Sequence, residues 1–392
     1  MGQSSDVVIV GGGVMGSAVA YFLAADPAFR GRILVVERDP TYARSTTALS
    51  VGSIRQQFST PENVRMSLFG AEFVARIGEF LAVDGEVPDI GWTQGGYLFL
   101  ATEAGMATLR RNHEVQYALG AENIVLSPPE IAGLFPWLDT SDLAGGSLGL
   151  RHEGWVDPYS LLQAFRRKAR ALGVEYREDE AIGFERDAGR IAAVRLAHAG
   201  PVACGAVVNA AGPHAGAVAR LAGVDLPVRP RKRFVYVFDC RRPVACRELV
   251  IDPSGVYFRP EGRQFIGGVS PPAEQDPDCL DLELDEALFY EVVWPTLARR
   301  VPLFESIKLT SCWAGHYDYN IVDQNAIIGP HPELRNLFFI NGFSGHGLQQ
   351  APAAGRALAE LLVDGAFRTL DLARLGYDRF ARGAFVREAN IV

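Results

Sequence analysis

The stretch Gly11-Gly12-Gly13-Val14-Met15-Gly16 fits the pattern Gly-x-Gly-x-x-Gly, and it lies between the apolar run 7–10 and a helix-like segment. Gly11 allows a sharp turn out of a strand, Gly13 allows the backbone to approach a pyrophosphate, and Gly16 allows close packing of helix on strand. A pyrophosphate is stabilised by the free N–H groups at the start of such a helix. The stretch therefore predicts a dinucleotide-binding unit.

A second apolar run, 33–36, ends at Glu37, about 20 residues after Gly16, where a carboxylate accepts hydrogen bonds from ribose hydroxyls. A 2′-phosphate would meet this negative charge, so NADP is disfavoured. The pattern does not by itself separate FAD from NAD. The alternative interpretation is a glycine-rich turn that merely joins a buried strand to a helix.

The composition of the 392 residues is that of a globular protein, with 48% apolar and 21% charged residues. This length predicts two domains, or one large domain with a second inserted in it. The net charge of −8 argues against nucleic acid as a partner. The densest basic cluster, Arg229, Arg231, Lys232 and Arg233, is interpreted as a solvated turn before the strand 234–238, with one arginine that faces a ligand as the alternative.

The five cysteines show no Cys-x-x-Cys spacing, which favours reduced thiols and a cytoplasmic location over disulfides or zinc. The seven histidines also lack metal-ligand spacing, so no metal is expected. Neither a signal peptide nor a membrane span is expected.

Apolar periodicity predicts the remaining elements. The polar segment 44–60 is expected to be a loop under a ligand. Residues 225–310 are expected to form an antiparallel sheet. Helices are predicted over 62–80, over 159–172 and after 347, and strands near 97–100, 174–176, 206–209, 265–266 and 337–340.

Taken together, these segments resemble the D-amino-acid-oxidase-like family of FAD oxidoreductases, in the branch of sarcosine oxidase, glycine oxidase and dimethylglycine dehydrogenase. The resemblance covers nearly the whole chain. Its most specific part is the run 342–347, Gly-Phe-Ser-Gly-His-Gly. The run 50–58 is similar to a subgroup that includes proteins linked to respiratory-complex assembly. The other matching segments are Gly11 to Gly16, Glu37-Arg38, Val156-Asp157-Pro158, Val208 to Gly212 and Trp313-Ala314-Gly315.

The resemblance implies an α/β fold, with a Rossmann-like FAD-binding domain and an inserted antiparallel β-sheet domain that binds substrate. The FAD-binding domain is expected over 1–85, 146–224 and 311–392, and the substrate-binding domain over 86–145 and 225–310. The residues expected to hold FAD are Gly11, Gly13, Val14, Met15, Gly16, Glu37, Arg38, Ser45, Thr46, Thr47, Ala211, Gly212, Gly315, Gly342, Ser344, Gly345, His346, Gly347 and Leu348.

The resemblance further implies oxidation of an amine by hydride transfer to flavin. Arg55 falls where relatives keep the arginine that binds the substrate carboxylate, a role that suits the planar guanidinium fork. The alternative for Arg55 is a pair with an acid such as Glu62, or a solvated side chain. Tyr257 and Arg259 are expected as a second recognition pair on one strand face, with an exposed stripe as the alternative.

His316 and Tyr317 follow a segment that lines the flavin cavity in relatives. Either residue is a candidate for hydrogen bonding to substrate, although a structural role is favoured for His316. The role expected of His346 is simply to shape the backbone of the flavin turn.

The chain also departs from its relatives. Some carry flavin on a cysteine close to the position of Gly315, whereas here Cys312 lies three residues earlier, so noncovalent FAD is predicted. Gln349 replaces a substrate-binding lysine. The lysine that helps oxygen react is absent from the run 264–268, and the only lysines are Lys168, Lys232 and Lys308. A dehydrogenase that passes electrons to another carrier is therefore at least as well supported as an oxidase.

The sequence thus predicts an FAD enzyme that oxidises the C–N bond of a small amino acid or an N-substituted amino acid. Its partners would be a carboxylate-bearing small molecule and an electron acceptor, oxygen or another carrier, and the oligomeric state is left open. One alternative is a dehydrogenase for hydroxy acids or polyol phosphates, with His316 as base. The other is a flavoprotein assembly factor with little catalysis.

Overall fold

The apolar run before the glycine turn forms a central strand of a mostly parallel sheet in the computed structural model, which describes residues 4–389. Along the main path of this sheet four successive pairs are parallel and the pair at one end is antiparallel, and the hairpin 181–196 adds antiparallel pairs beside the strand 200–209. The strand order is β17 (Ile327–Pro330), β18 (Leu337–Asn341), β11 (Gly200–Asn209), β1 (Ser4–Val10), β2 (Ile33–Glu37) and β8 (Glu175–Glu178).

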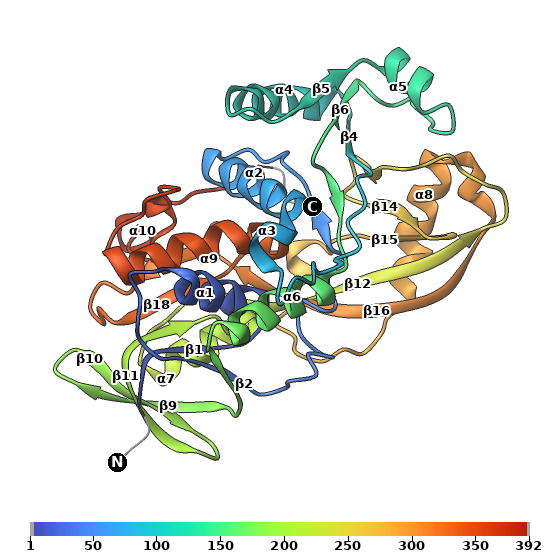
Figure 1. Cartoon of the computed structure of the whole chain (residues 1–392). Coiled ribbons are helices and arrows are strands. Elements are labelled where there is room, and N and C mark those ends of the chain that lie inside the picture. The colour runs from blue at the N-terminus through green and yellow to red at the C-terminus, as the bar shows by residue number, and fades with distance from the viewer. Residues whose placement is uncertain (1–3, 390–392) are drawn as a thin grey trace.

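Helices cover one face of this first sheet, because apolar side chains of the strands and helices meet in one large core. In Figure 1 the helices of this layer lie together above β1 and β2. The layer contains α1 (Val14–Ala25), α2 (Pro61–Ala75), α3 (Ile77–Leu81), α6 (Pro158–Ala171) and α9 (Gly347–Asp364). The other face packs on α7 (Ala215–Leu221) and the hairpin β9 (Ala181–Asp187) and β10 (Arg190–Leu196).

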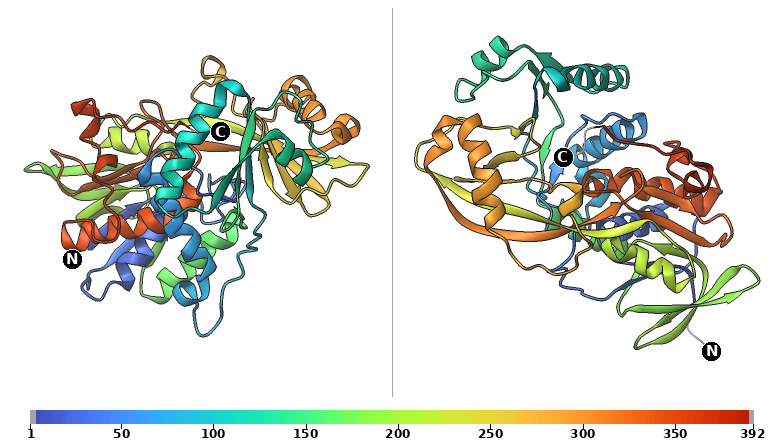
Figure 2. Two further views of the ribbon diagram at one scale, coloured as in Figure 1. Left: turned by 90° about the horizontal axis from the view of Figure 1, so that it is seen from above. Right: turned by 180° about the vertical axis from the view of Figure 1, so that it is seen from behind.

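A second eight-stranded sheet stands beside the first, as the views in Figure 2 show. All its pairs are antiparallel except β13 with β4. Its order is β16 (Ile307–Asn320), β12 (Val228–Cys240), β15 (Gln264–Gly268), β14 (Tyr257–Glu261), β13 (Leu249–Ile251), β4 (Tyr97–Ala101), β6 (Gly145–Gly149) and β5 (Asn123–Leu126).

One face of the second sheet carries an aromatic core that includes Phe238, Phe258 and Phe304. This core also takes in the π-helix Phe289–Val293 and α8 (Trp294–Arg300). Because side chains alternate along a strand, the opposite face presents a different set, which includes Tyr97, Leu249 and Ile251. Residues of that second face line a cavity together with the glycine turn that follows β1.

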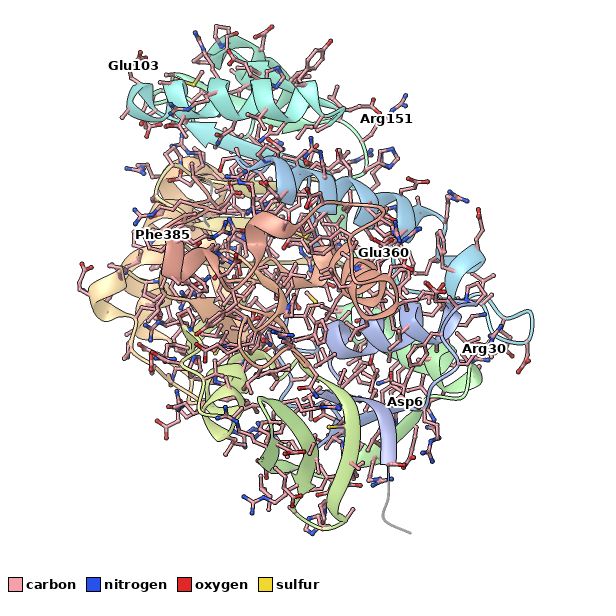
Figure 3. The ribbon with its side chains drawn as sticks, turned by 90° about the vertical axis from the view of Figure 1, so that its left-hand side faces the viewer. Asp6, Arg30, Glu103, Arg151, Glu360 and Phe385 are labelled. Atoms are coloured by element: carbon pink, nitrogen blue, oxygen red, sulfur yellow. The ribbon has the colours of Figure 1, made fainter. Side chains whose placement is uncertain are left out.

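The remaining elements are short or lie at the periphery. Glu103 and Arg151 mark an outer lobe at one end of the molecule, and Asp6 and Arg30 lie toward the other end (Figure 3). The lobe contains α4 (Glu103–Ala118) and α5 (Pro128–Leu134). The short helix α10 (Arg379–Arg382) lies near the end of the described chain. The short strand β3 (Ser53–Ile54) pairs with β7 (Gly154–Trp155). Among residues 4–389, no helix is both long and apolar enough to cross a membrane.

The predicted α/β fold is confirmed, and three details differ. The helix predicted over 62–80 divides at Arg76, whose φ of −113° is not helical. The predicted turn at 229–233 is wrong, because these residues belong to β12, which pairs with β16. The predicted domain boundaries at 146 and 311 fall inside β6 and β16, so each would cut a paired strand. The described cysteines are all free.

Candidate cofactor and substrate cavity

The glycine turn between β1 and α1 is shaped by close backbone contacts. Gly11 has a φ of +103°, and a Cβ there would lie 2.4 Å from the carbonyl oxygen of Ala210. A Cβ on Gly16 would lie 1.9 Å from the carbonyl oxygen of Gly11. By contrast, a Cβ on Gly13 would meet only the Thr47 hydroxyl, at 3.4 Å. Gly11 and Gly16 are therefore required by the protein itself, whereas Gly13 leaves room for a ligand.

Glu37 lies at the end of β2, beside this turn. Its carboxylate accepts hydrogen bonds from the Gly12 N–H at 2.8 Å and the Asp39 N–H at 2.9 Å. The neighbouring Arg38 approaches His214, with Nη2 2.5 Å from Nε2. Burial and then the charge of Arg38 lower the pKa of His214 to about 4, so this histidine is neutral at pH 7.

A cavity of about 770 Å³ begins at the glycine turn and reaches the second sheet. Among the residues expected to hold FAD, Gly11, Gly13, Val14, Met15, Glu37, Arg38, Ser45, Thr46, Thr47, Ala211, Gly212, Gly315, Gly345, His346, Gly347 and Leu348 line it. Gly16, Gly342 and Ser344 do not line it. Gly16 permits the helix packing described above, and Ser344 has its hydroxyl bonded to the Asn320 N–H at 3.0 Å.

The turn before α9 brings the late glycine motif to this cavity. Asp318 holds the turn, since its Oδ2 accepts hydrogen bonds from the N–H groups of Gly342 and Phe343 at 2.7 and 3.2 Å. Gly345 has a φ of +99°, and a Cβ there would lie 2.5 Å from the Tyr317 ring. α9 then begins at Gly347, so its N-terminal N–H groups and the positive end of its dipole are directed toward the cavity wall.

Arg55 follows β3 and lines the cavity with only 5% of its surface exposed. Its backbone N–H donates to Gln349 Oε1 at 2.7 Å, and its Nη2 lies 3.1 Å from His346 Nε2. The guanidinium also lies 4.8 Å from the centre of the Phe58 ring. Glu62, the acid considered as an alternative partner, binds Arg374 instead, at 2.7 Å.

The electrostatics around Arg55 keep His346 neutral. Burial and the adjacent guanidinium lower the pKa of His346 well below its usual value. The neutral ring then accepts the hydrogen bond of Arg55 on Nε2, which places its own proton on Nδ1. His346 therefore contacts the candidate substrate arginine through its side chain, in addition to shaping the turn.

Glu153 is a buried acid in the loop behind Arg55. It accepts hydrogen bonds from the Gln56 N–H at 2.7 Å and from Gln57 Nε2 at 2.9 Å. Burial raises the pKa of Glu153 to about 7, against the opposing effect of these bonds and of Arg55. Glu153 was not predicted from the sequence, because nothing in the local pattern marks an acid after β6 as buried.

The second sheet contributes the other wall of the cavity. Tyr257 and Tyr97 line it together with Leu249 and Ile251. Burial raises the pKa of Tyr97 to about 12 and that of Tyr257 further, so both keep their phenolic protons at neutral pH. This wall is aromatic and aliphatic, with two hydroxyl groups as hydrogen-bonding partners.

Arg259 does not line the cavity, which corrects the expected pair of Tyr257 and Arg259. Its Nη2 donates to the Val51 carbonyl oxygen at 2.9 Å, and its guanidinium lies 4.6 Å from the Trp155 ring centre. It also binds Glu261. The two residues share a strand face as expected, but the loop at Val51 covers Arg259.

Gly315, His316, Tyr317 and Gln349 all line the cavity. His316 Nε2 lies 2.8 Å from the carbonyl oxygen of Asp281, and burial lowers the pKa of His316. Arg233, which lines the cavity beside Tyr317, was missed as an individual site residue. One signal in the sequence could have found it. If the predicted strand 234–238 is extended by one residue, Arg233 falls on the same face as Val235, which also lines the cavity.

The cavity residues fit a flavin dinucleotide. Thr46 lines the cavity, and its buried hydroxyl has no hydrogen-bond partner among residues 4–389. Two glycine turns, each followed by a helix, reach the same cavity from opposite ends of the chain. Donors for a pyrophosphate, an acid for a ribose and a second helix N-terminus for a flavin edge are thus all present.

The comparison with family models agrees with this geometry. Residues 6–361 match the family described as DAO, FAD dependent oxidoreductase. The chain belongs to this family. It is an oxidoreductase that uses FAD.

Individual relatives of this oxidoreductase extend over its whole length. It is 46% identical over 425 residues to "FAD-dependent oxidoreductase domain-containing protein 1" of Bos taurus, which covers 100% of this chain and 87% of that protein. It is 26% identical to glycine oxidase of Bacillus licheniformis, over 94% of this chain and 96% of that enzyme.

Among solved structures, the oxidoreductase is similar to L-proline dehydrogenase from P. horikoshii. The TM-score is 0.86 and the identity 27%, over 98% of this chain and 100% of that one. The predicted relationship to amine-oxidising flavoproteins is confirmed.

Proposed function

We propose that this oxidoreductase oxidises the C–N bond of a small amino acid or an N-substituted amino acid. The observation that carries the proposal is the buried guanidinium of Arg55 in the wall of the FAD cavity, against the turn that begins α9. A guanidinium with fixed orientation suits a carboxylate, which it binds through two parallel hydrogen bonds. Relatives named for glycine and L-proline support an amino acid as the substrate.

FAD, when bound, accepts the hydride from the carbon next to nitrogen. The chain's own residues bind and orient the substrate. Arg55 holds the carboxylate, and neutral His346 and Gln349 hold Arg55 in turn. Leu249 and Ile251 exclude water from the apolar part of the substrate, and the hydroxyl groups of Tyr97 and Tyr257 are available to its polar part.

The electron acceptor is proposed to be a carrier other than oxygen. No lysine lines the cavity among the described residues. Lys168 donates to the Ala82 carbonyl oxygen, and Lys232 pairs with Asp281. A cation that would stabilise reduced oxygen is therefore not supplied by lysine.

The hydroxy-acid alternative receives less support. It needs a base in contact with the substrate, and His316 was its only candidate. Because the Nε2 of His316 donates to the Asp281 carbonyl oxygen at 2.8 Å, only Nδ1 keeps a lone pair for a base, and burial lowers the pKa of this ring, which makes it a weaker base.

Anaerobic titration of the purified holoprotein tests the proposal. We expect glycine, sarcosine, L-proline or a related amino acid to bleach the absorption of oxidised flavin. Reduction by hydroxy acids alone would favour the rival chemistry. Flavin that no amine or hydroxy acid reduces would contradict both and favour the assembly role. Acid precipitation of the same sample tests the noncovalent attachment, since released FAD stays in the supernatant.

A further inference from the structure

An irregular segment, residues 276–283, lies along the free edge of β12, and we call it the strap. β15 pairs only with the part of β12 from Tyr236 to Phe238, so the edge before Tyr236 lacks that neighbour. The strap occupies this edge, where Asp278 bridges to Arg231 and the Cys279 N–H donates to the Pro230 carbonyl oxygen at 3.0 Å. Few backbone bonds hold it.

Side-chain ion pairs hold the strap from both faces of β12. Arg233 binds Asp276 through two hydrogen bonds of 2.7 and 2.8 Å, and these two side chains are 10% and 9% exposed. On the opposite face, Lys232 binds Asp281 at 2.7 Å, with the Asp281 side chain 50% exposed. Arg231, which shares a strand face with Arg233, binds Asp278, whose side chain is 54% exposed, and also lies 3.6 Å from Asp276. The basic cluster of the sequence is therefore the anchor of the strap.

The strap also forms part of the wall of the FAD cavity. Leu280 lines the cavity, although its surface is 44% exposed. The Asp281 carbonyl oxygen contacts Nε2 of His316, another cavity residue, at 2.8 Å. Arg233 lines the cavity as well. Within its eight residues, the strap thus both forms the ion pairs with β12 and contributes to the wall of the FAD cavity.

We propose that the strap controls the release of FAD, and that its detachment from β12 opens the cavity for the cofactor to leave. The buried pair of Arg233 and Asp276 holds the strap closed, because exposed ion pairs contribute little and a buried bidentate pair resists separation. This inference concerns cofactor retention and holds whichever substrate the enzyme oxidises.

The test compares FAD release from the holoprotein and two variants. Each sample is diluted rapidly to a low concentration, and the rise in flavin fluorescence gives the dissociation rate. Asp276→Asn should accelerate release by about tenfold, because it leaves the Arg233 charge buried without its partner. The control is Asp278→Asn. The Asp278 side chain is 54% exposed and Arg231 keeps Asp276 at 3.6 Å, so the rate should change by less than about threefold.

A second variant avoids the ion pairs altogether. Leu280→Ala removes the side chain that lines the cavity, keeps every charge, and should accelerate release by about threefold or more. If Asp276→Asn does not fold, the rate of FAD release from Leu280→Ala tests the proposal in its place. Release from Asp276→Asn at the wild-type rate, equal acceleration in both aspartate variants, or an unchanged rate in Leu280→Ala would each overturn the proposal.

Discussion

At the scale of single residues, Arg55 is fixed through its backbone and its side chain at once. Replacing it by Lys keeps a positive charge but loses the planar fork. We expect kcat/KM for the amino acid substrate to fall by about 100-fold, with the bound FAD and its spectrum unchanged, because a charge-assisted bond contributes about 1.5–3 kcal/mol. Steady-state kinetics with an artificial electron acceptor measure this.

Arg259→Lys provides the matched control for Arg55→Lys. Arg259 is buried to a similar degree but does not line the cavity, and its Nη2 binds the Val51 carbonyl oxygen. The kcat/KM of the Arg259→Lys variant should stay within about threefold of the wild-type value when both are corrected for FAD content. Equal losses in the two variants would contradict the assignment of the carboxylate to Arg55.

Glu153 gives the protein a pH-dependent stability at the same scale. Its pKa of about 7 in the folded state lies above the ordinary value for Glu. As the pH rises from about 4.5 to 7, the unfolded chain releases this proton before the folded protein does, so stability falls over this window. It is not regained above pH 7.

Glu153→Gln should remove this dependence. Measured by urea unfolding, the stability of the wild type relative to the variant should fall by up to about 3 kcal/mol between pH 5 and pH 8. Comparison with the variant cancels the titration of all other groups. A constant difference between the two proteins across this range would show that Glu153 does not titrate there.

At the scale of elements, Gly13 and Gly16 of the β1–α1 turn have different roles, one in binding FAD and the other in the stability of the protein. Gly16→Ala would press a Cβ against the Gly11 carbonyl oxygen and should lower the free energy of unfolding of the apoprotein by about 1–3 kcal/mol. Gly13→Ala has a permissive φ of −60° and open space, so the apoprotein should keep its stability while FAD binds at least about tenfold more weakly.

Urea unfolding of both apoproteins and fluorescence titration with FAD separate these effects. The two variants serve as controls for each other, since each residue is a glycine of the same turn. If Gly13→Ala bound FAD as tightly as the wild type, the turn would not be the place where backbone and cofactor meet.

Elements with strong local patterns could be predicted from the sequence, as β1, β2, β18 and α6 show. Each of them carries its apolar periodicity within a few residues. The basic cluster could not be placed, because the acids that pair with Arg231, Lys232 and Arg233 lie more than 40 residues later in the strap. The prediction that Arg259 faces the substrate was wrong for a related reason. The alternation of side chains along a strand gives the face on which Arg259 lies, but it does not show the loop that covers that face.

At the scale of the whole molecule, the C-terminal part of the chain is held to the rest by a buried ion pair. Arg379 in α10 binds Asp323, after β16, with distances of 2.8 and 2.9 Å, and both side chains are 0% exposed. Further along, Glu388 accepts hydrogen bonds from Thr60 and Asn63 at 3.1 and 2.9 Å. The last residues described thus pack beside the segment that carries Arg55.

Arg379→Met should therefore destabilise the whole first domain. Because Asp323 would stay buried without its partner, we expect a loss of about 3–5 kcal/mol in the free energy of unfolding. Arg382→Ala is the control, since its pair with Asp378 is more than half exposed and should contribute less than about 1 kcal/mol. Urea unfolding measures both, and similar losses would contradict a special role for the buried pair.

The contacts of Gln349 and His346 with Arg55 have a thermodynamic consequence. The first turn of α9 holds the arginine with its side chains, and the same turn lines the cavity that would hold FAD. Whatever orders that turn acts on both sites, and such coupling between two ligands is reciprocal. A carboxylate bound at Arg55 should tighten the hold on FAD by the same factor by which FAD tightens the hold on the carboxylate. The two ligands would then bind cooperatively, whichever of them arrives first.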